Sequence, residues 1–409
     1  MNTQWKKTFA LIFSGQIFSI LTSFMVQFSI IWHLTKTTES ASVLMIAGLA
    51  GFLPQALLGP FIGVWLDRWD RKVTMMVADS AIALSSLILG AYFLWGESNV
   101  WVVYLILLIR SAASSFHAPA FQAAIPLIAP QDQLTRVAGW HQLVFSSSSV
   151  LGPALGIAVY SATSLGTVLL LDVVGALIAN LMLLLIKINQ PKPENSQAPS
   201  FRKEFILGWI TFLSVKSVVT ITVAMAVFSV VFMPLAMLFP LMTLSHFGRG
   251  GYSASLIEAV FGIGMILGGA ILSAIASKWK DSTYMSLSLV LIGFTCVLSG
   301  VIGSNAFIAF IVLSFCMGAA APLFNGPYMA MIQKSYEPEK LGRVLSFVTS
   351  IGLLSSPIGL ALAGPIVDRF GVQVWFFWSG IVVILIGALI FFMVSRKEDI
   401  CGRQESNKQ

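Results

Sequence analysis

Four charged side chains lie well inside long apolar stretches of this chain: Asp79, Arg110, Asp172 and Glu258. A charge in hydrocarbon costs about 2.5–3.5 kcal/mol on insertion scales, so each needs a partner or a task. Apolar surroundings favour the neutral form of a carboxyl group and a nearby arginine favours its charged form, so such a group can load and release a proton. We therefore predict Asp172 and Glu258 as proton-coupling residues, with Arg110 as the partner of a carboxylate or of a bound molecule. A structural ion pair, or hydrogen bonds to backbone carbonyls, is the alternative for Arg110.

A dense charged loop lies between two other apolar runs. Its candidate gating residues are Gly63, Asp67, Arg68, Asp70, Arg71 and Lys72. A carboxylate there can accept hydrogen bonds at a helix N-terminus, where the helix dipole favours negative charge. The basic residues can pair with acids on neighbouring helices and form a latch between two states, and we expect Asp79 to join them. The alternative is that the basic residues of the loop only set the orientation of the chain in the membrane.

The sequence Gly152-Pro153-x-x-Gly156 lies inside a further apolar run. Proline removes a backbone donor and kinks a helix, whereas glycine lets a neighbouring helix approach closely. We interpret the motif as a bent, tightly packed seal against proton leak. The alternative is that these residues have no special role, because Gly and Pro are common in membrane helices.

Uncharged polar side chains inside the apolar runs are candidates for lining a cavity. They are Gln16, Gln27, Asn180 and Asn325. Hydrogen bonding between helices is the alternative for most of them. We interpret His117 and His141 each as an interfacial or paired histidine; sensing of pH near neutrality is the alternative.

The elements that position these residues follow from composition. Of the 409 residues 57% are hydrophobic and 10% are charged, and the mean hydropathy is +0.88. Soluble chains are about 45–50% apolar and about 25% charged, so lipid must be the solvent for most of this chain. The net charge of +7 sits between apolar runs. This placement favours basic residues at membrane edges and excludes a nucleic-acid partner.

Signatures of catalysis are missing from the sequence. The P-loop pattern Gly-x-x-x-x-Gly-Lys-Ser/Thr does not occur, so ATP is not the expected fuel. Three cysteines and four histidines are too scattered for a metal site or a disulfide framework. We predict a protein that is not an enzyme and needs no cofactor or metal, with an ion gradient as its energy source.

Twelve apolar runs are long enough to cross a bilayer as helices, which requires about 20 residues each. They cover residues 8–34, 42–66, 73–95, 99–120, 137–160, 164–187, 217–243, 253–277, 283–303, 306–333, 343–367 and 373–395. We predict an all-α integral membrane protein with twelve transmembrane helices. Twenty of the 24 Lys and Arg residues fall on the side of the two termini, and three fall on the other side. This bias predicts that both termini are cytoplasmic.

A polar, proline-containing stretch divides the runs into two sets of six. We predict an N-terminal bundle over 1–187, a cytoplasmic linker over 188–216, a C-terminal bundle over 217–395 and a cytoplasmic tail over 396–409. The apolar segment 205–214 of the linker predicts a short interfacial helix.

Short sequence matches relate the two halves. Phe116-His-Ala-Pro119 recurs as Phe324-Asn-Gly-Pro327, and Leu134-Thr-Arg-Val137 recurs as Leu341-Gly-Arg-Val344. These matches predict pseudo-symmetric six-helix bundles. Such repeats place a substrate cavity near the middle of the membrane, with access that alternates as one half rocks against the other.

Over essentially its whole length the chain resembles the major facilitator superfamily. Residues 63–72 are similar to the family's G-x-x-x-D-R-x-G-R-K signature, with Asp70 where the family has glycine. A tight turn there must tolerate a side chain, and Asp adopts left-handed geometry more readily than most residues. Arg110 stands where the family places a membrane-embedded arginine. Residues 152–156 resemble the G-P-x-x-G core of its drug:proton antiporters.

Within the superfamily, four segments resemble the bacterial macrolide-efflux branch. They are Gly51-Phe-Leu-Pro54, Phe116-His-Ala-Pro-Ala120, Leu341-Gly-Arg-Val344 and Ser356-Pro-Ile-Gly-Leu-Ala361. The resemblance implies a monomer in the bacterial plasma membrane that exports bulky hydrophobic antibiotics in exchange for protons. It leaves open a separate ATP-binding partner protein. A major-facilitator transporter of another small solute, and a non-transporting membrane partner or sensor, are the alternatives.

Overall fold

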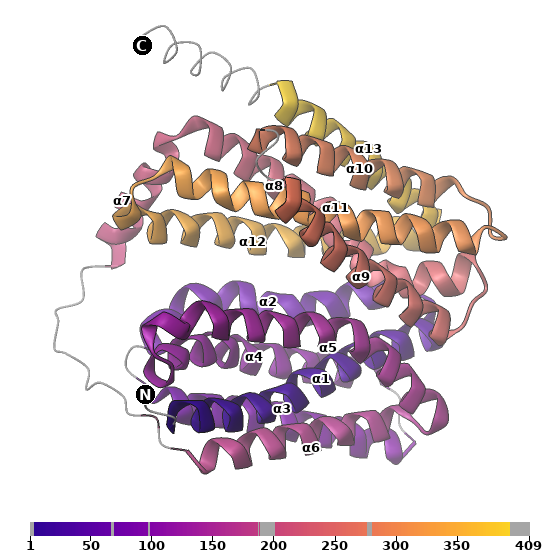
Figure 1. The fold of residues 1–409 in the computed structure, drawn as a ribbon. Helices are drawn as coiled ribbons and strands as arrows, with labels where there is room; N and C mark the ends of the chain where they lie inside the picture. The colour runs from indigo at the N-terminus through magenta and orange to yellow at the C-terminus, as the bar shows by residue number, and fades with distance from the viewer. Residues whose placement is uncertain are drawn as a thin grey trace, which may run out of the picture. The chain divides into compact units, whose positions relative to one another are not determined.

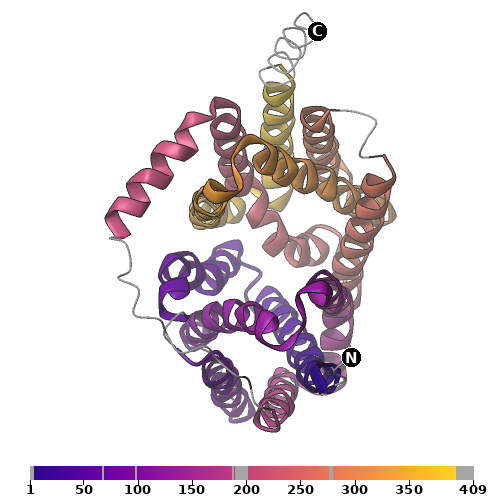
Figure 2. The same cartoon turned by 60° about the vertical axis from the view of Figure 1, so that its left-hand side comes forward.

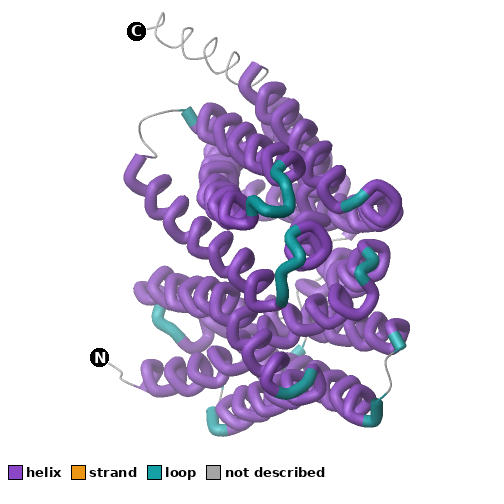
Figure 3. The backbone as a smooth tube through the Cα atoms, turned by 90° about the vertical axis from the view of Figure 1, so that its right-hand side faces the viewer, coloured by secondary structure: helices purple, strands orange, loops and turns teal. Residues whose placement is uncertain are grey.

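The computed structural model describes residues 4–66, 69–96, 99–186, 188, 201–275 and 280–392. Over these residues the chain forms helices joined by turns, without a strand (Figure 3). Twelve of the described helices are long and apolar enough to cross a membrane. The predicted all-α membrane fold is therefore confirmed.

The first compact unit comprises Met1–Ser196 together with Gly250–Ala259. Its helices are α1 (Gln4–Thr38), α2 (Ala41–Leu66), α3 (Arg71–Leu94), α4 (Val100–Ile128), the short η1 (Gln131–Gln133), α5 (Leu134–Ala162) and α6 (Leu165–Leu184). Within this unit α1 packs against α5 and α6, α3 packs against α4 and α6, and α2 packs against α4.

The second unit comprises Gln197–Arg249 and Val260–Gln409. Its helices are α7 (Phe201–Ser214), α8 (Lys216–Leu241), η2 (Met242–His246), most of α9 (Gly251–Ile275), α10 (Asp281–Val301), α11 (Phe307–Ser335), α12 (Pro338–Phe370) and α13 (Val372–Ile390). The segment predicted as an interfacial helix is helical, and it begins four residues earlier than expected. Trp209 and Phe212 of α7 pack against Phe347 of α12, which ties α7 to this unit.

Four of the helix pairings inside the first unit recur inside the second. The pair α1–α6 corresponds to α8–α13, and α1–α5 corresponds to α8–α12. In the same way α3–α4 corresponds to α10–α11, and α3–α6 corresponds to α10–α13. Helices α10 and α13 lie side by side in Figures 1 and 2. These four pairings give the two units a shared internal plan.

The fourth predicted span was too short. Helix α4 continues through Pro119 and Pro126 and ends at Ile128, eight residues beyond the expected limit. Proline is tolerated inside a membrane helix because neighbouring helices and local adjustments satisfy the carbonyl it leaves free. This extension matters because α4 carries Arg110 and His117 along one continuous rod.

Candidate functional site

A cavity of about 430 Å³ lies within the first unit and is lined by residues of α1 to α5. Its polar lining residues are Gln16, Ser19, Ser23, Gln27, Gln55, Asp79, Arg110, Ser111, Ser114, His117, Gln122 and His141. Its size falls within the range of small-molecule sites, about 300–1,000 Å³. A mixed polar and apolar cavity in a membrane helix bundle is a site at which a solute can bind.

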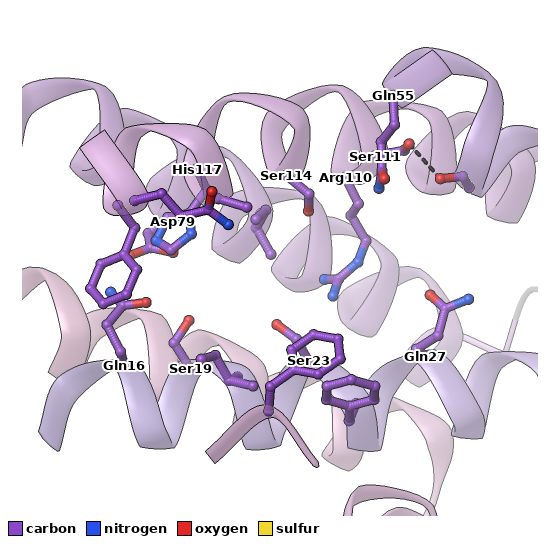
Figure 4. Close-up of a pocket in the computed structure, with 18 of the residues that line it drawn as sticks. Gln16, Ser19, Ser23, Gln27, Gln55, Asp79, Arg110, Ser111, Ser114 and His117 are labelled. Atoms are coloured by element: carbon purple, nitrogen blue, oxygen red, sulfur yellow. Dashed lines mark hydrogen bonds and ion pairs between the residues drawn. The ribbon is translucent and has the colours of Figure 1, made fainter. Parts of the chain in front are cut away.

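One face of α1 supplies a row of polar side chains to this cavity. Gln16, Ser19, Ser23 and Gln27 follow one another at spacings of three and four residues, so they share a helix face. Figure 4 shows this row opposite Arg110, Ser114 and His117 of α4. The facing rows give the cavity polar side chains on two sides although both helices are apolar overall.

Arg110 and Asp172 form a buried ion pair. The guanidinium Nη1 of Arg110 lies 2.6 Å from Asp172 Oδ2, and the two residues are 8% and 2% exposed. Helix α4 places the arginine at the cavity wall, and α6 places the carboxylate behind it, outside the lining. The structure therefore brings together two of the three charged residues predicted for proton coupling.

Hydroxyl groups complete the coordination of Asp172. Its Oδ2 accepts a hydrogen bond from Ser86 at 2.8 Å, and Ser86 also contacts the guanidinium of Arg110. Its Oδ1 accepts from Thr22 at 3.2 Å and from Ser23 at 3.3 Å. Both oxygens are thus occupied, which is what a carboxylate needs in order to remain charged away from water.

A second pair of titratable residues lines the same cavity. His117 Nε2 lies 3.3 Å from Asp79 Oδ1, without the alignment of a hydrogen bond. The expected pairing of Asp79 with the charged loop is not seen among the described residues, where its ion-pair partner is His117 of α4. One of the two interpretations of His117, a paired histidine, matches this arrangement.

The remaining predicted residues lie in different places. Gln16 and Gln27 line the cavity. Asn180 instead joins two helices, since its Nδ2 donates to Ser80 Oγ at 3.0 Å, and Asn325 is exposed on α11. Glu258 is half-buried on α9 and forms no ion pair with a described residue.

Asp70 of the charged loop caps helix α3. Its Oδ1 accepts a hydrogen bond from the backbone N–H of Val73 at 3.0 Å, and its backbone is extended, with φ −68° and ψ 116°. The expected left-handed turn is therefore absent at Asp70. A capping carboxylate explains why an aspartate serves at this position, because it satisfies an N–H that the first turn leaves free.

Lys72 ties the start of α3 to the end of α6. Its Nζ donates to Ile186 O at 2.6 Å, a main-chain acceptor where an acidic partner was expected. Arg71 Nε is buried without a hydrogen-bond partner among the described residues. Gly63 lies within α2, and Asp67 and Arg68 lie outside the described residues.

The glycines of the Gly152-Pro153-x-x-Gly156 motif permit close contact between α5 and α1. A Cβ at Gly152 would overlap with the side chain of Phe24, and a Cβ at Gly156 would lie 2.7 Å from Met25 O. Pro153 lies inside α5, which continues from Leu134 to Ala162. The motif therefore fixes the distance between two helices that line the cavity.

Sequence reasoning missed several lining residues, among them Gln55, Gln122 and the serines of α1 and α4. A signal for some of them existed. Polar residues at positions 16, 19, 23 and 27 repeat with the period of a helix inside an apolar run, and this pattern marks a face that avoids lipid.

Comparisons with known proteins agree with this architecture. The family model of the Major Facilitator Superfamily matches residues 12–294 and 235–406. Macrolide efflux protein A of Streptococcus pyogenes is 36% identical over 401 residues, which cover 97% of this chain and 98% of that protein. The protein of the same name from Enterococcus faecalis is 36% identical over 324 residues, covering 78% of this chain and 99% of its own length.

Solved structures show the same fold at low sequence identity. The nucleoside transporter NupG superposes with a TM-score of 0.74 at 10% identity, over 96% of this chain and 99% of that one. A bacterial homologue of the human lysosomal transporter Spinster gives a TM-score of 0.73 at 13% identity, over 96% and 97%. The resemblance expected from the sequence is thus confirmed, and the chain is a multi-pass membrane transporter that belongs to the major facilitator superfamily.

Proposed function

We propose that this chain exports macrolide antibiotics in exchange for protons. The observation that carries the proposal is its 36% identity, over nearly the full length of both chains, to a protein named for macrolide efflux. The cavity in the first unit supports it, because phenyl rings and polar groups together line a space of about 430 Å³. A bulky apolar molecule with a few polar substituents suits such a lining.

The ion pair of Arg110 and Asp172 is the proposed coupling site. Protonation of Asp172 removes one charge of the pair and weakens its hold on the guanidinium, which then turns toward the cavity or toward a bound molecule. Loss of the proton restores the pair. Glu258 is a second candidate, since it has no ion-pair partner among the described residues and is half-buried.

The charged loop and the glycine motif support the conformational cycle in this proposal. Asp70 and Lys72 fix the start of α3 and join it to α6, so the loop can act as one part of a latch. The tight contact of Gly152 and Gly156 with α1 seals the bundle against proton leak. The proposed assembly is a monomer, and a separate ATP-binding partner protein is not needed for this cycle.

The proposed orientation in the plasma membrane places both termini in the cytoplasm. It is supported by twenty of the 24 basic residues on that side of the predicted spans. Reporter fusions that are active on only one side of the membrane test it, one at the C-terminus and one in the turn between α3 and α4. Activity of both fusions on the same side would contradict the orientation.

The central test is transport of a labelled macrolide in energised vesicles that contain the full chain. We expect accumulation in inverted vesicles, and its loss when an uncoupler collapses the proton gradient. Vesicles with Arg110→Met provide the inactive comparison. Uptake that persists with the uncoupler would exclude proton coupling. A native chain that moves a nucleoside or another solute, but no macrolide, would replace the proposed substrate.

A further inference from the structure

The cavity contains a carboxylate that the proposed coupling pair does not use. Asp79 is 2% exposed, yet its Oδ2 has no hydrogen-bond partner among the described residues. Asp172 differs in this respect, because both of its oxygens accept hydrogen bonds. A buried carboxylate with an unfilled acceptor is costly, so Asp79 is built to receive a donor or a cation that the chain itself does not supply.

Two further buried atoms without partners lie around the same point. Gln16 is 2% exposed and its Nε2 lacks an acceptor, and His117 Nε2 is not aligned to bond with Asp79. These atoms come from α1, α3 and α4, and Figure 4 shows Gln16 near the adjacent side chains of Asp79 and His117. Three unsatisfied polar atoms on three helices indicate a site for a bound group, since native structures leave few such atoms unpaired.

The other titratable groups around Asp79 do not neutralise it. Among the described lining residues Asp79 is the one carboxylate, and Arg110 is engaged by Asp172. Helices α1 and α2 place no titratable side chain in the lining, and α5 places His141 there. The titratable side chain of α6 is Asp172, which lies outside the lining. The charge of Asp79 is therefore balanced either by a proton on His117 or by a cation in the cavity.

Aromatic rings suit the cavity to an organic cation. Phe24 and Phe145 form an edge-to-face pair with centroids 5.2 Å apart, and Phe121 lies 5.2 Å from the ring of His141. All four rings line the cavity. Aromatic faces attract ammonium groups and also contact the hydrocarbon attached to them.

We propose that Asp79 binds the cationic amine of a lipophilic substrate and that a proton on His117 displaces it. With His117 neutral, the negative charge of Asp79 attracts the cationic group, and its Oδ2 is free to accept a hydrogen bond from an ammonium. With His117 protonated, Nε2 donates to Asp79 and the positive charge of the imidazolium replaces that of the substrate. This inference rests on the proposed export of drugs and adds the group that recognises their charge.

Binding of a permanently charged probe tests the proposal in the purified full-length chain. Tetraphenylphosphonium does not titrate, so any pH dependence of its affinity belongs to the protein. We expect it to bind about tenfold more tightly at about pH 8 than at about pH 6. Asp79→Asn should weaken binding at the higher pH by about tenfold or more, while uncharged triphenylphosphine oxide keeps its affinity within about twofold. Glu337→Gln, which removes an exposed carboxylate outside the spans, is the matched control.

His117→Gln provides the second arm. This variant should bind tetraphenylphosphonium about equally at the two pH values, because the competing charge is gone. Native affinity in Asp79→Asn, or equal weakening of the charged and uncharged probes, would overturn the proposal. If Asp79→Asn does not fold, an unchanged pH dependence in His117→Gln overturns it. A chain that binds the cation as expected but exports no macrolide refutes only the proposed substrate.

Discussion

Among single residues, the ion pair of Arg110 and Asp172 has the clearest energetic consequence. Removing one partner of a buried pair costs about 3–5 kcal/mol, because the other charge stays buried without compensation. Asp172→Asn should therefore lower the midpoint of thermal unfolding more than the double variant Arg110→Met/Asp172→Asn does. Both should lose export. Unfolding of detergent-purified protein measures the difference, with Glu337→Gln as control. A double variant less stable than the single one would contradict the assignment.

Part of this site was predictable from sequence. A charge inside an apolar run must be paired or functional, and this rule points to Arg110 and Asp172 from the sequence alone. The partner of Asp79 was not predictable. The pairing of Asp79 with His117 depends on the rotation of α3 against α4, and a hydropathy pattern does not specify that rotation when lipid surrounds both helices.

Among the helices, α3 allows a test of whether Asp70 acts as its N-terminal cap. Asp70 accepts from the backbone of Val73, and replacing an N-cap Asp with Ala costs about 0.5–2 kcal/mol, whereas Gly costs only a few tenths. We expect Asp70→Ala to accelerate amide exchange in the first turn of α3, and Asp70→Asn to preserve native exchange. Asp70→Gly, the residue typical of the family, should be close to native. Equal exchange in all three variants would exclude a capping role.

The contact of α5 with α1 predicts a different set of outcomes. Gly152→Ala places a Cβ against Phe24, and such overpacking costs about 1–3 kcal/mol. Gly139 lies on the same helix with nothing within 4 Å of its would-be Cβ. Gly139→Ala should therefore leave the midpoint of thermal unfolding unchanged or raise it. A loss of stability in Gly139→Ala equal to that in Gly152→Ala would show that the effect is not steric.

The second bundle repeats this contact, and sequence comparison alone did not reveal it. A Cβ at Gly359 of α12 would overlap with the backbone of Val230 on α8, as the Cβ at Gly152 would overlap with Phe24 on α1. The two glycines are 207 residues apart, the spacing that also relates Leu134 to Leu341. The repeat was hidden because Leu360 stands where the first half has Pro153. Close packing of two helices requires the glycine at the contact but places no requirement on the residue that follows it.

For the whole molecule, the number of spans was predictable and the path of α4 was not. Apolar runs of about 20 residues identify membrane helices because the bilayer thickness sets their length. Continuation through Pro119 and Pro126 depends on the helices packed around α4, which the sequence does not name. The polar row on α1 was visible as a periodic pattern, but its partner row on α4 came only from the helix pairing.

Charge balance across the whole molecule predicts which part of the proton gradient drives export. Exchange of a cation at Asp79 for one proton moves no net charge, whereas a proton carried on Asp172 moves one positive charge inward. One charge crossing 100 mV is worth about 2.3 kcal/mol, roughly a fiftyfold gradient. A potassium diffusion potential in vesicles without a pH gradient should therefore drive export of a cationic macrolide by the native chain. Export that follows the pH gradient but ignores the potential would show that Asp172 carries no charge across the membrane.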